Sequence, residues 1–288
     1  MIAIQHTIQH AKFFPSQVRG DQPKVWRSYN PSACGSLIAY RCEHKDEVLW
    51  RRPCRIAVAH LIRTSTGDFY CRGNKALDLQ TTTGWCEDPR LFKWGHDMWL
   101  FYTDGRRMHA ALLDDDLNVA WNTQLEYGDD HVEKNWTPWV VGDQLFALYR
   151  TWPFAVISIE RTAWNLRCRR VSVSDPDGMP HTARGGAPML DLGGRWLCCW
   201  QRHVENNSIR HYRIGFSLLR GSPEKPEFLW HADDAIVAPQ APEWSSVLFP
   251  GSCELLPDGT LRLACGLHDR ECVIIDRYSP PRPIATPE

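Results

Sequence analysis

The stretch EDPRLFKWGHDMWLFY, residues 87–102, combines a polar opening that contains proline, a short apolar run, a tight turn at Gly95 and a second apolar run. The same phrase returns as NPSACGSLIAYR (30–41), TPWVVGDQLFALYR (137–150), APMLDLGGRWLCCW (187–200) and FPGSCELLPDGTLRLAC (249–265). Repeats of roughly 50 residues made of short strands and tight turns are typical of β-propellers. The sequence therefore predicts an all-β fold, a five-bladed β-propeller, as a single domain over residues 1–288.

The predicted repeats open near residues 30, 87, 134, 184 and 247. Short apolar runs at 156–159, 214–219 and 272–275 follow three of them and are expected to form further strands of the same blades. One candidate helix lies at 6–14. Residues 278–288 carry four prolines and are expected to form an irregular tail.

Composition excludes several classes of function. The net charge is −1 over 288 residues, so no bulk electrostatic attraction to nucleic acid or an anionic membrane is expected. No apolar run approaches the roughly 18 residues of a membrane span, and residues 1–11 lack a secretory pattern. The eleven cysteines show no zinc-ligand spacing, which favours buried thiols in a reducing cytoplasm and no metal site. Oligomeric state leaves no signal in the sequence.

Charged and amide side chains recur at the openings and strand ends of the repeats. In a propeller the innermost strand of each blade begins near the shared axis, so these side chains are expected to face one cavity. Asp88 before proline is also a common turn former, and Glu87 with Arg90 also fits a structural ion pair. Two glycines after Arg184 would allow the backbone to approach a ligand closely. The set comprises Glu87, Asp88, Arg90, Glu133, Lys134, Asn135, Trp136, Arg150, Arg184, Gln201, His203 and Asp269.

The phrase EDPR at 87–90 resembles the motif of glycoside hydrolase family 130, which comprises mannoside phosphorylases and related mannosidases on a five-bladed propeller. Further segments match the family's pattern in the same order over about residues 30–277. They are KN (134–135), Arg150, RGGAP (184–188), YRIG (212–215), FPG (249–251) and CGLHD (265–269). The chain departs from the family at WQRH (200–203), where the family has Tyr-His-Gly, and at Leu267-His268 before Asp269.

The resemblance implies a role for each matching residue. Asp88 would be the general acid that protonates the departing glycosidic oxygen. Inorganic phosphate would be the co-substrate, with no other cofactor. Its binding site would comprise Lys134, Asn135, Arg150 and Arg184, completed by His203 or, in its place, Gln201. The substrate site would comprise Asp269, Gln201, Trp136, Glu87 and Arg90, of which the last two would also support Asp88.

The chemistry fits that assignment, because inversion at an anomeric carbon needs an acid on one face and a nucleophile on the other. Water needs a carboxylate base, whereas phosphate needs cations that hold its charge. The sequence therefore predicts an inverting glycoside phosphorylase, or a related glycosyl-transferring enzyme, that takes a β-mannoside-like oligosaccharide or a sugar phosphate.

Alternatives remain open at this stage. Glu133 would be the base of an inverting hydrolase, and a β-mannosyltransferase would use the same fold. A non-catalytic propeller would bind glycans through some of its 14 tryptophans, although most of these are expected to fill the spaces between blades.

Overall fold

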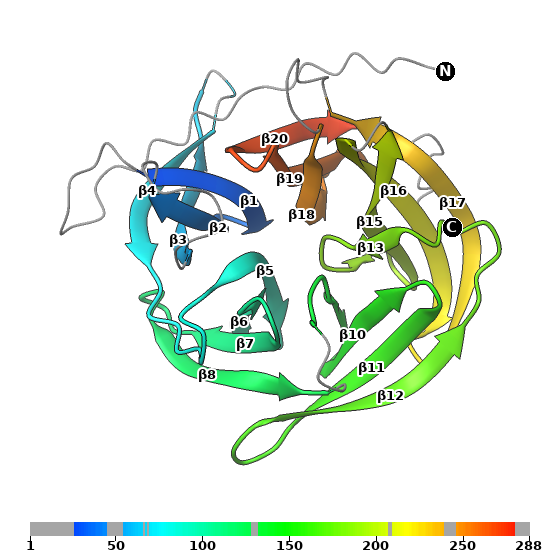
Figure 1. Cartoon of the computed structure of the whole chain (residues 1–288), viewed down its shortest axis with the longest axis horizontal. Helices are drawn as coiled ribbons and strands as arrows, with labels where there is room; N and C mark the ends of the chain where they lie inside the picture. The colour runs from blue at the N-terminus through cyan, green and yellow to red at the C-terminus, as the bar shows by residue number, and fades with distance from the viewer. Residues whose placement is uncertain are drawn as a thin grey trace.

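The protein is an all-β, five-bladed propeller, seen along its axis in Figure 1. The computed structural model describes residues 26–44, 54–65, 67, 69–127, 132–206, 209–238 and 246–279. These ranges contain twenty strands and no helix, so no helix among them could cross a membrane. The candidate helix at 6–14 and most of the predicted tail lie outside the described residues. The all-β prediction and the predicted blade number are confirmed.

Blades I and II each contain four antiparallel strands, numbered outward from the axis. Blade I comprises β1 (Trp26–Cys34), β2 (Leu37–His44), β3 (Arg55–Arg63) and β4 (Phe69–Ala76). Blade II comprises β5 (Glu87–Trp94), β6 (Asp97–Thr103), β7 (Met108–Leu113) and β8 (Val119–Glu126).

Blades III to V complete the ring. Blade III comprises β9 (Thr137–Val141), β10 (Gln144–Thr151), β11 (Phe154–Arg161) and β12 (Leu166–Ser174). Blade IV comprises β13 (Ala183–Gly185), β14 (Leu190–Asp191), β15 (Arg195–Asn206), β16 (Ile209–Ser222) and β17 (Lys225–Val237). Blade V comprises β18 (Leu248–Leu255), β19 (Leu261–Leu267) and β20 (Glu271–Tyr278). The outer strands β8 and β12 pair in parallel, which joins the edges of blades II and III.

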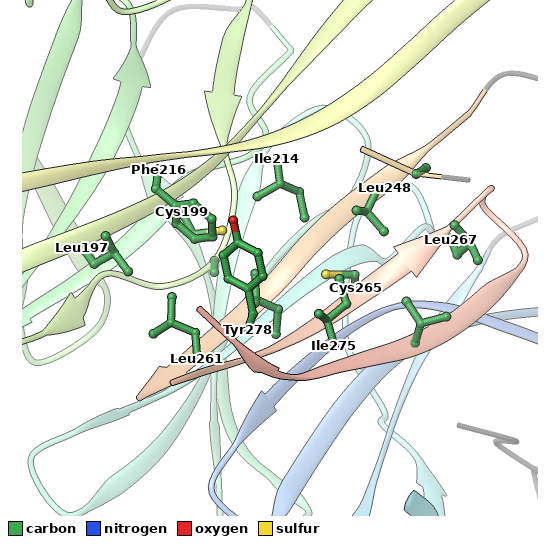
Figure 2. Packing of buried hydrophobic residues seen from close by; sticks show 14 of the residues in the cluster. Leu197, Cys199, Ile214, Phe216, Leu248, Leu261, Cys265, Leu267, Ile275 and Tyr278 are labelled. Carbon is green, nitrogen blue, oxygen red and sulfur yellow. The ribbon is translucent and has the colours of Figure 1, made fainter. Parts of the chain in front are cut away.

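The apolar runs of the repeats pack between neighbouring blades. Figure 2 shows one such cluster, where Cys199 and Phe216 of blade IV meet Cys265 and Tyr278 of blade V. Tyr278 is the last residue of β20 and only 1% exposed, so the irregular tail cannot begin there as predicted. Its ring packs where a blade would otherwise leave a gap, as a large aromatic side chain does in a core.

All eleven cysteines are free thiols, and most of them are buried in these clusters. Cys198 and Cys199 point to opposite faces of β15 and enter two different clusters. Burial raises the pKa of both thiols. The cysteines therefore act as small apolar residues of the core.

The innermost strands of blades I and II share a bulge that shapes the centre of the ring. Pairing skips two residues in each strand, between Tyr29 and Ser32 and between Glu87 and Arg90. The skipped pairs are Asn-Pro and Asp-Pro, and their first residues have φ of 49° and 56°. Asn and Asp tolerate this left-handed region better than most side chains, and proline has no N–H to leave unpaired.

Blade V lies directly against the bulge of blade I. A Cβ atom on Gly251 would lie 1.7 Å from the carbonyl oxygen of Pro31, and one on Gly266 would lie 2.0 Å from Asn30 Oδ1. Only glycine permits such approach. The first and last blades are thus fixed in register at the axis, where Asn30 faces the centre.

Candidate active site

The openings of the innermost strands surround two cavities. The central cavity, of about 270 Å³, is lined by residues from all five blades, among them Asn30, Asp88 and Asp269. The side cavity, of about 400 Å³, lies between blades III and IV. Three residues line both cavities, namely Lys134, Asn135 and Arg184. These three residues form the boundary between the two cavities.

Asp88 projects into the central cavity from the bulge of β5. Its carboxylate Oδ1 accepts a hydrogen bond of 2.9 Å from Asn30 Nδ2, across the gap between blades I and II. The side chain is half-buried. The left-handed backbone at both residues turns these side chains toward each other and toward the axis.

Asp269 approaches the same point from blade V. It lies two residues after the end of β19, in a left-handed conformation with φ of 52°. Burial raises the pKa of Asp269 to about 6, and the neighbouring Asp88 carboxylate adds to this effect. A hydrogen bond from Asn30 opposes the shift. Asn30 therefore connects two carboxylates that come from different blades.

Glu87 forms an ion pair with Arg41 of blade I at 2.7 Å. Burial and the adjacent Asp88 charge raise the pKa of Glu87, while Arg41 opposes them. The guanidinium of Arg41 lies 4.8 Å from the ring centroid of Tyr29, a cation–π contact. The structural ion pair considered for Glu87 with Arg90 is thus made with Arg41 instead.

Arg90 lies beneath the central cavity and is 1% exposed. Its Nε donates to the carbonyl oxygen of Gly186 at 2.5 Å, and its Nη1 donates to that of Pro89 at 2.9 Å. The guanidinium carbon lies 4.6 Å from the ring centroid of Phe249. Burial lowers the pKa of Arg90 to about 10. Arg90 therefore ties blades II, IV and V together under Asp88 and has no surface left for the predicted substrate contact.

The boundary residues combine two cations with an amide. Lys134 and Arg184 are exposed, and Asn135 is partly exposed in a left-handed conformation with φ of 63°. Arg184 Nη1 donates to the carbonyl oxygen of Ala183 at 2.8 Å. Neither cation pairs with a carboxylate in the described part of the chain.

The two glycines after Arg184 lie very close to the backbone of neighbouring segments. A Cβ atom on Gly185 would lie 1.9 Å from the carbonyl oxygen of Asn135, and one on Gly186 would lie 2.5 Å from that of Cys199. Both glycines therefore permit close approach of neighbouring protein backbone, and Gly185 also lines the side cavity. The close approach packs blade IV against the loop that carries the boundary residues of blade III.

Glu133 lines the side cavity but is only 6% exposed. Tyr149 Oη donates to one carboxylate oxygen at 2.7 Å, and Trp136 Nε1 donates to the other at 3.1 Å. Trp136 itself is 0% exposed. Glu133 is thus held by two hydrogen bonds and is nearly inaccessible to a substrate water, and Trp136 lacks the surface that a substrate contact needs.

The remaining predicted residues divide between the cavities. Gln201 and His203 of β15 line the central cavity, and the buried Oε1 of Gln201 has no hydrogen-bond partner among the described residues. Arg150, at the end of β10, lines only the side cavity. Four of the five predicted phosphate-binding residues therefore line the side cavity together, whereas His203 lines only the central cavity.

Sequence reasoning missed the contribution of blade I. Tyr29, Asn30, Arg41 and Glu43 all line the central cavity. Two signals were available, because Asn30-Pro31 opens its repeat as Asp88-Pro89 does, and Arg41 ends its apolar run as Arg150 does. Tyr212 and Phe249 in the central cavity were also missed, as were Trp152 and His181 in the side cavity. No group of three or more potential metal ligands occurs in the described ranges.

Comparison with known proteins reveals the fold but no sequence family. No family model matches the chain, and no curated protein matches it in sequence. A mannose phosphorylase from Leishmania mexicana, solved with a phosphate ion, is 16% identical with a TM-score of 0.57, over 97% of this chain and 92% of that one. A GDP-Man-dependent mannosyltransferase from the same organism is 14% identical with a TM-score of 0.56, over 96% and 94%.

An endo-1,4-beta-xylanase from Bacteroides thetaiotaomicron also matches, with 11% identity and a TM-score of 0.53, over 87% of this chain and 90% of that one. At such identities the likeness establishes a shared fold and no more. The chain has the five-bladed propeller fold of carbohydrate-active enzymes that include a phosphorylase, a transferase and a hydrolase.

Proposed function

We propose that the protein is an inverting glycoside phosphorylase that acts on a β-mannoside-like substrate with inorganic phosphate as co-substrate. One observation carries this proposal. The carboxylate of Asp88 and the boundary residues Lys134, Asn135 and Arg184 line the same central cavity. An acid and an anion site in one cavity are what phosphorolysis of a glycoside requires.

The reaction assigns a place to each group. A phosphate oxygen held at Lys134 and Arg184 attacks the anomeric carbon, while the bond from that carbon to the glycosidic oxygen breaks. Asp88 transfers its proton to the departing oxygen, and the products are a sugar 1-phosphate with inverted configuration and a free hydroxyl on the leaving group. Asn30 holds the Asp88 carboxylate through the 2.9 Å hydrogen bond and so orients it.

The sugar ring fits best between Asp269 and Gln201. Asp269 offers carboxylate oxygens to hydroxyl groups, and the buried Gln201 Oε1 is an acceptor without a partner among the described residues. A buried acceptor without a partner costs roughly 1–3 kcal/mol, so a sugar hydroxyl that donates to it would make the binding free energy of the sugar more favourable. The choice of a mannoside rests on the resemblance of EDPR to family 130 and on the fold shared with a mannose phosphorylase.

Hydrolysis is the weaker alternative, because Glu133 is only 6% exposed and its carboxylate is held by Tyr149 and Trp136. The central cavity contains three further carboxylates. Glu87 is paired with Arg41, Asp269 is adjacent to Asp88, and Glu43 accepts a hydrogen bond of 2.9 Å from Tyr29 Oη. The first two are thus less suited to activating a water on the face opposite the acid, and Glu43 is the remaining candidate for such a base.

The test is the phosphate dependence of turnover. The purified protein is incubated with β-linked manno-oligosaccharides, with and without inorganic phosphate, and α-mannose 1-phosphate is quantified by ³¹P NMR. We expect its formation only with phosphate and its absence in Asp88→Asn. Release of free mannose independent of phosphate would indicate a hydrolase. Saccharide binding without any turnover, equal in Asp88→Asn, would indicate a glycan-binding propeller.

A further inference from the structure

The central cavity is acidic on the side that blades I, II and V form. These blades contribute four carboxylates to its lining, namely those of Glu43, Glu87, Asp88 and Asp269. Among the described residues that line the cavity, the same blades contribute one cation, Arg41, which forms its ion pair with Glu87 at 2.7 Å. Three of the four carboxylates therefore have no ion pair within the described part of the chain.

Two of these three carboxylates, Glu43 and Asp269, are not the acid of the proposed reaction. Glu43 Oε2 accepts a hydrogen bond of 2.9 Å from Tyr29 Oη, and Asp269 accepts one from Asn30. Both side chains are partly exposed and line the cavity. They lie close enough together for the charge of Glu43 to raise the pKa of Asp269. Carboxylates that share a cavity in this way attract a cation.

Gln201 adds a separate acceptor to the same cavity from blade IV. The residue is only 2% exposed, and its Oε1 has no hydrogen-bond partner among the described residues. A buried acceptor in this state favours a ligand that donates a hydrogen bond to it. The cavity therefore suits a ligand that combines positive charge with several N–H and O–H donors.

The arrangement of the acids suits an organic cation better than a metal ion. Calcium and magnesium take about six or more oxygen ligands at about 2.0–2.6 Å. No group of three or more His, Cys, Asp or Glu side chains in the described ranges converges closely enough to hold such an ion. An ammonium group needs only hydrogen bonds of about 2.7–2.9 Å to one or two carboxylates. Glu43 and Asp269, from two different blades, meet this lesser demand.

We infer that the donor sugar of the proposed phosphorylase is an amino sugar, with its protonated amine bound between Glu43 and Asp269. Phosphate at the boundary and Asp88 lie on opposite faces of the anomeric carbon, as inversion requires. Phosphate then neutralises the cationic side of the cavity, and the ammonium neutralises the acidic side. In this assignment Glu43 binds substrate and does not activate water. The inference rests on the proposed function, because Asp88 and the phosphate fix the orientation of the sugar ring.

Binding of monosaccharides tests the inference without turnover. The full-length protein is titrated calorimetrically with mannosamine, 6-amino-6-deoxymannose, N-acetylmannosamine and mannose, each in the presence of saturating inorganic phosphate. The first two sugars carry an ammonium group at different carbons, the third has an uncharged nitrogen, and mannose has none. We expect at least one of the two amines to bind roughly tenfold more tightly than both neutral sugars, in line with one charge-assisted hydrogen bond.

Charge-removing variants assign the contacts. Glu43→Gln and Asp269→Asn keep the size of each side chain and remove its charge. Each should reduce the preference for the amino sugar by about threefold, and the double variant should abolish the preference with less change in the binding of mannose. The matched controls are Glu224→Gln and Asp97→Asn, both on exposed residues. Thermal unfolding of each variant shows whether it is folded before its affinity is interpreted.

Equal affinity for the amines and for mannose would overturn the inference, as would a preference that persists in the double variant. Binding of calcium ion alone, lost in the double variant, would also overturn it, because the acidic side would then be a metal site. A preference for an amine without phosphorolysis of any β-linked glycoside, amino-sugar glycosides included, would contradict the proposed function and leave the ammonium site in place. Phosphorolysis of neutral mannosides with no such preference would retain the proposed function and overturn the inference alone.

Discussion

The two halves of the site differ in how firmly the protein holds them. The acidic half, formed by Asn30, Asp88 and Asp269 of blades I, II and V, is fixed by hydrogen bonds between blades and by left-handed backbone at each residue. The cationic half, formed by Lys134, Arg150 and Arg184 of blades III and IV, is exposed and lacks carboxylate partners among the described residues. The protein itself organises the acid, whereas an anion is needed to organise the cations.

This difference is expected from the chemistry. Under the proposed function, a proton donor must be placed to within a fraction of an ångström of the leaving oxygen, and the packing of three blades would fix that position. Phosphate would bring its own charge and bind where the exposed cations converge on it. In the acidic half, a change of geometry should therefore reduce turnover even when the charge is kept. In the cationic half, loss of charge should matter most.

Asp88→Asn should have the largest effect. The amide retains an oxygen that accepts the hydrogen bond from Asn30, so the fold is expected to persist, but the proton donor is lost. We expect turnover to fall by about 10²- to 10⁴-fold, the usual contribution of general acid catalysis. Initial rates are compared with those of Asp97→Asn, an exposed aspartate on β6. A loss of turnover below threefold would show that Asp88 is not the general acid.

Lys134→Met should come next and act through phosphate. The substitution keeps the apolar stem and removes the charge at the boundary between the cavities. Because the site is exposed, we expect kcat/KM for phosphate to fall by about tenfold to a hundredfold, with less change in kcat/KM for the glycoside. Lys93→Met, at the far end of β5, is the control. An unchanged kcat/KM for phosphate would show that Lys134 does not bind the phosphate that reacts.

Glu133→Gln should affect stability rather than turnover. Trp136 and Tyr149 both donate to the carboxylate, and an amide can accept only at its oxygen, so one buried donor loses its partner. We expect a loss of roughly 1–3 kcal/mol in the free energy of unfolding, measured by urea denaturation. Turnover per folded molecule should be roughly that of Glu224→Gln, an exposed control. A selective loss of activity by a hundredfold or more would restore Glu133 as a base.

Asp269→Asn should have the smallest effect on stability, and this effect should depend on pH. The pKa of Asp269 is raised to about 6 in the folded protein, so its carboxyl group binds a proton more tightly there than in the unfolded chain. Its contribution to stability is therefore present at pH 4 and lost as the pH rises through 6. Relative to the parent, Asp269→Asn should gain up to about 2 kcal/mol between pH 4 and pH 7. Thermal melts across this range, with Asp97→Asn as the control, measure the difference, and a constant difference would show that Asp88 and burial do not perturb Asp269.

The sequence allowed the architecture to be predicted because each repeat carries its own strand and turn signals. The phrase at 87–102 becomes β5, the turn at Gly95 and β6. The polar openings also led to Asp88, Lys134, Asn135 and Arg184, which do line one cavity. These residues are found from sequence because their blade position follows from the repeat itself.

The contacts between blades could not be predicted in this way. Asn30 donates a hydrogen bond to Asp88, 58 positions along the sequence, and Glu87 pairs with Arg41 instead of Arg90. The packing of blade I against blade II decides both contacts. The close approach of Gly185 to the backbone of Asn135 likewise depends on the packing of blade IV against blade III. The burial of Glu133 against Tyr149 and Trp136 disfavours its predicted role as a base. Such burial depends on how the blades pack together and leaves no signal in the local sequence.

A crystal structure of the protein soaked in phosphate tests the central claim most directly, namely that one anion joins the two halves of the site. We expect an anion at the boundary, in contact with the Lys134 ammonium, the Asn135 amide and the Arg184 guanidinium, and open to the cavity that Asp88 lines. An empty boundary at saturating phosphate, with Lys134 and Arg184 turned toward solvent, would contradict it.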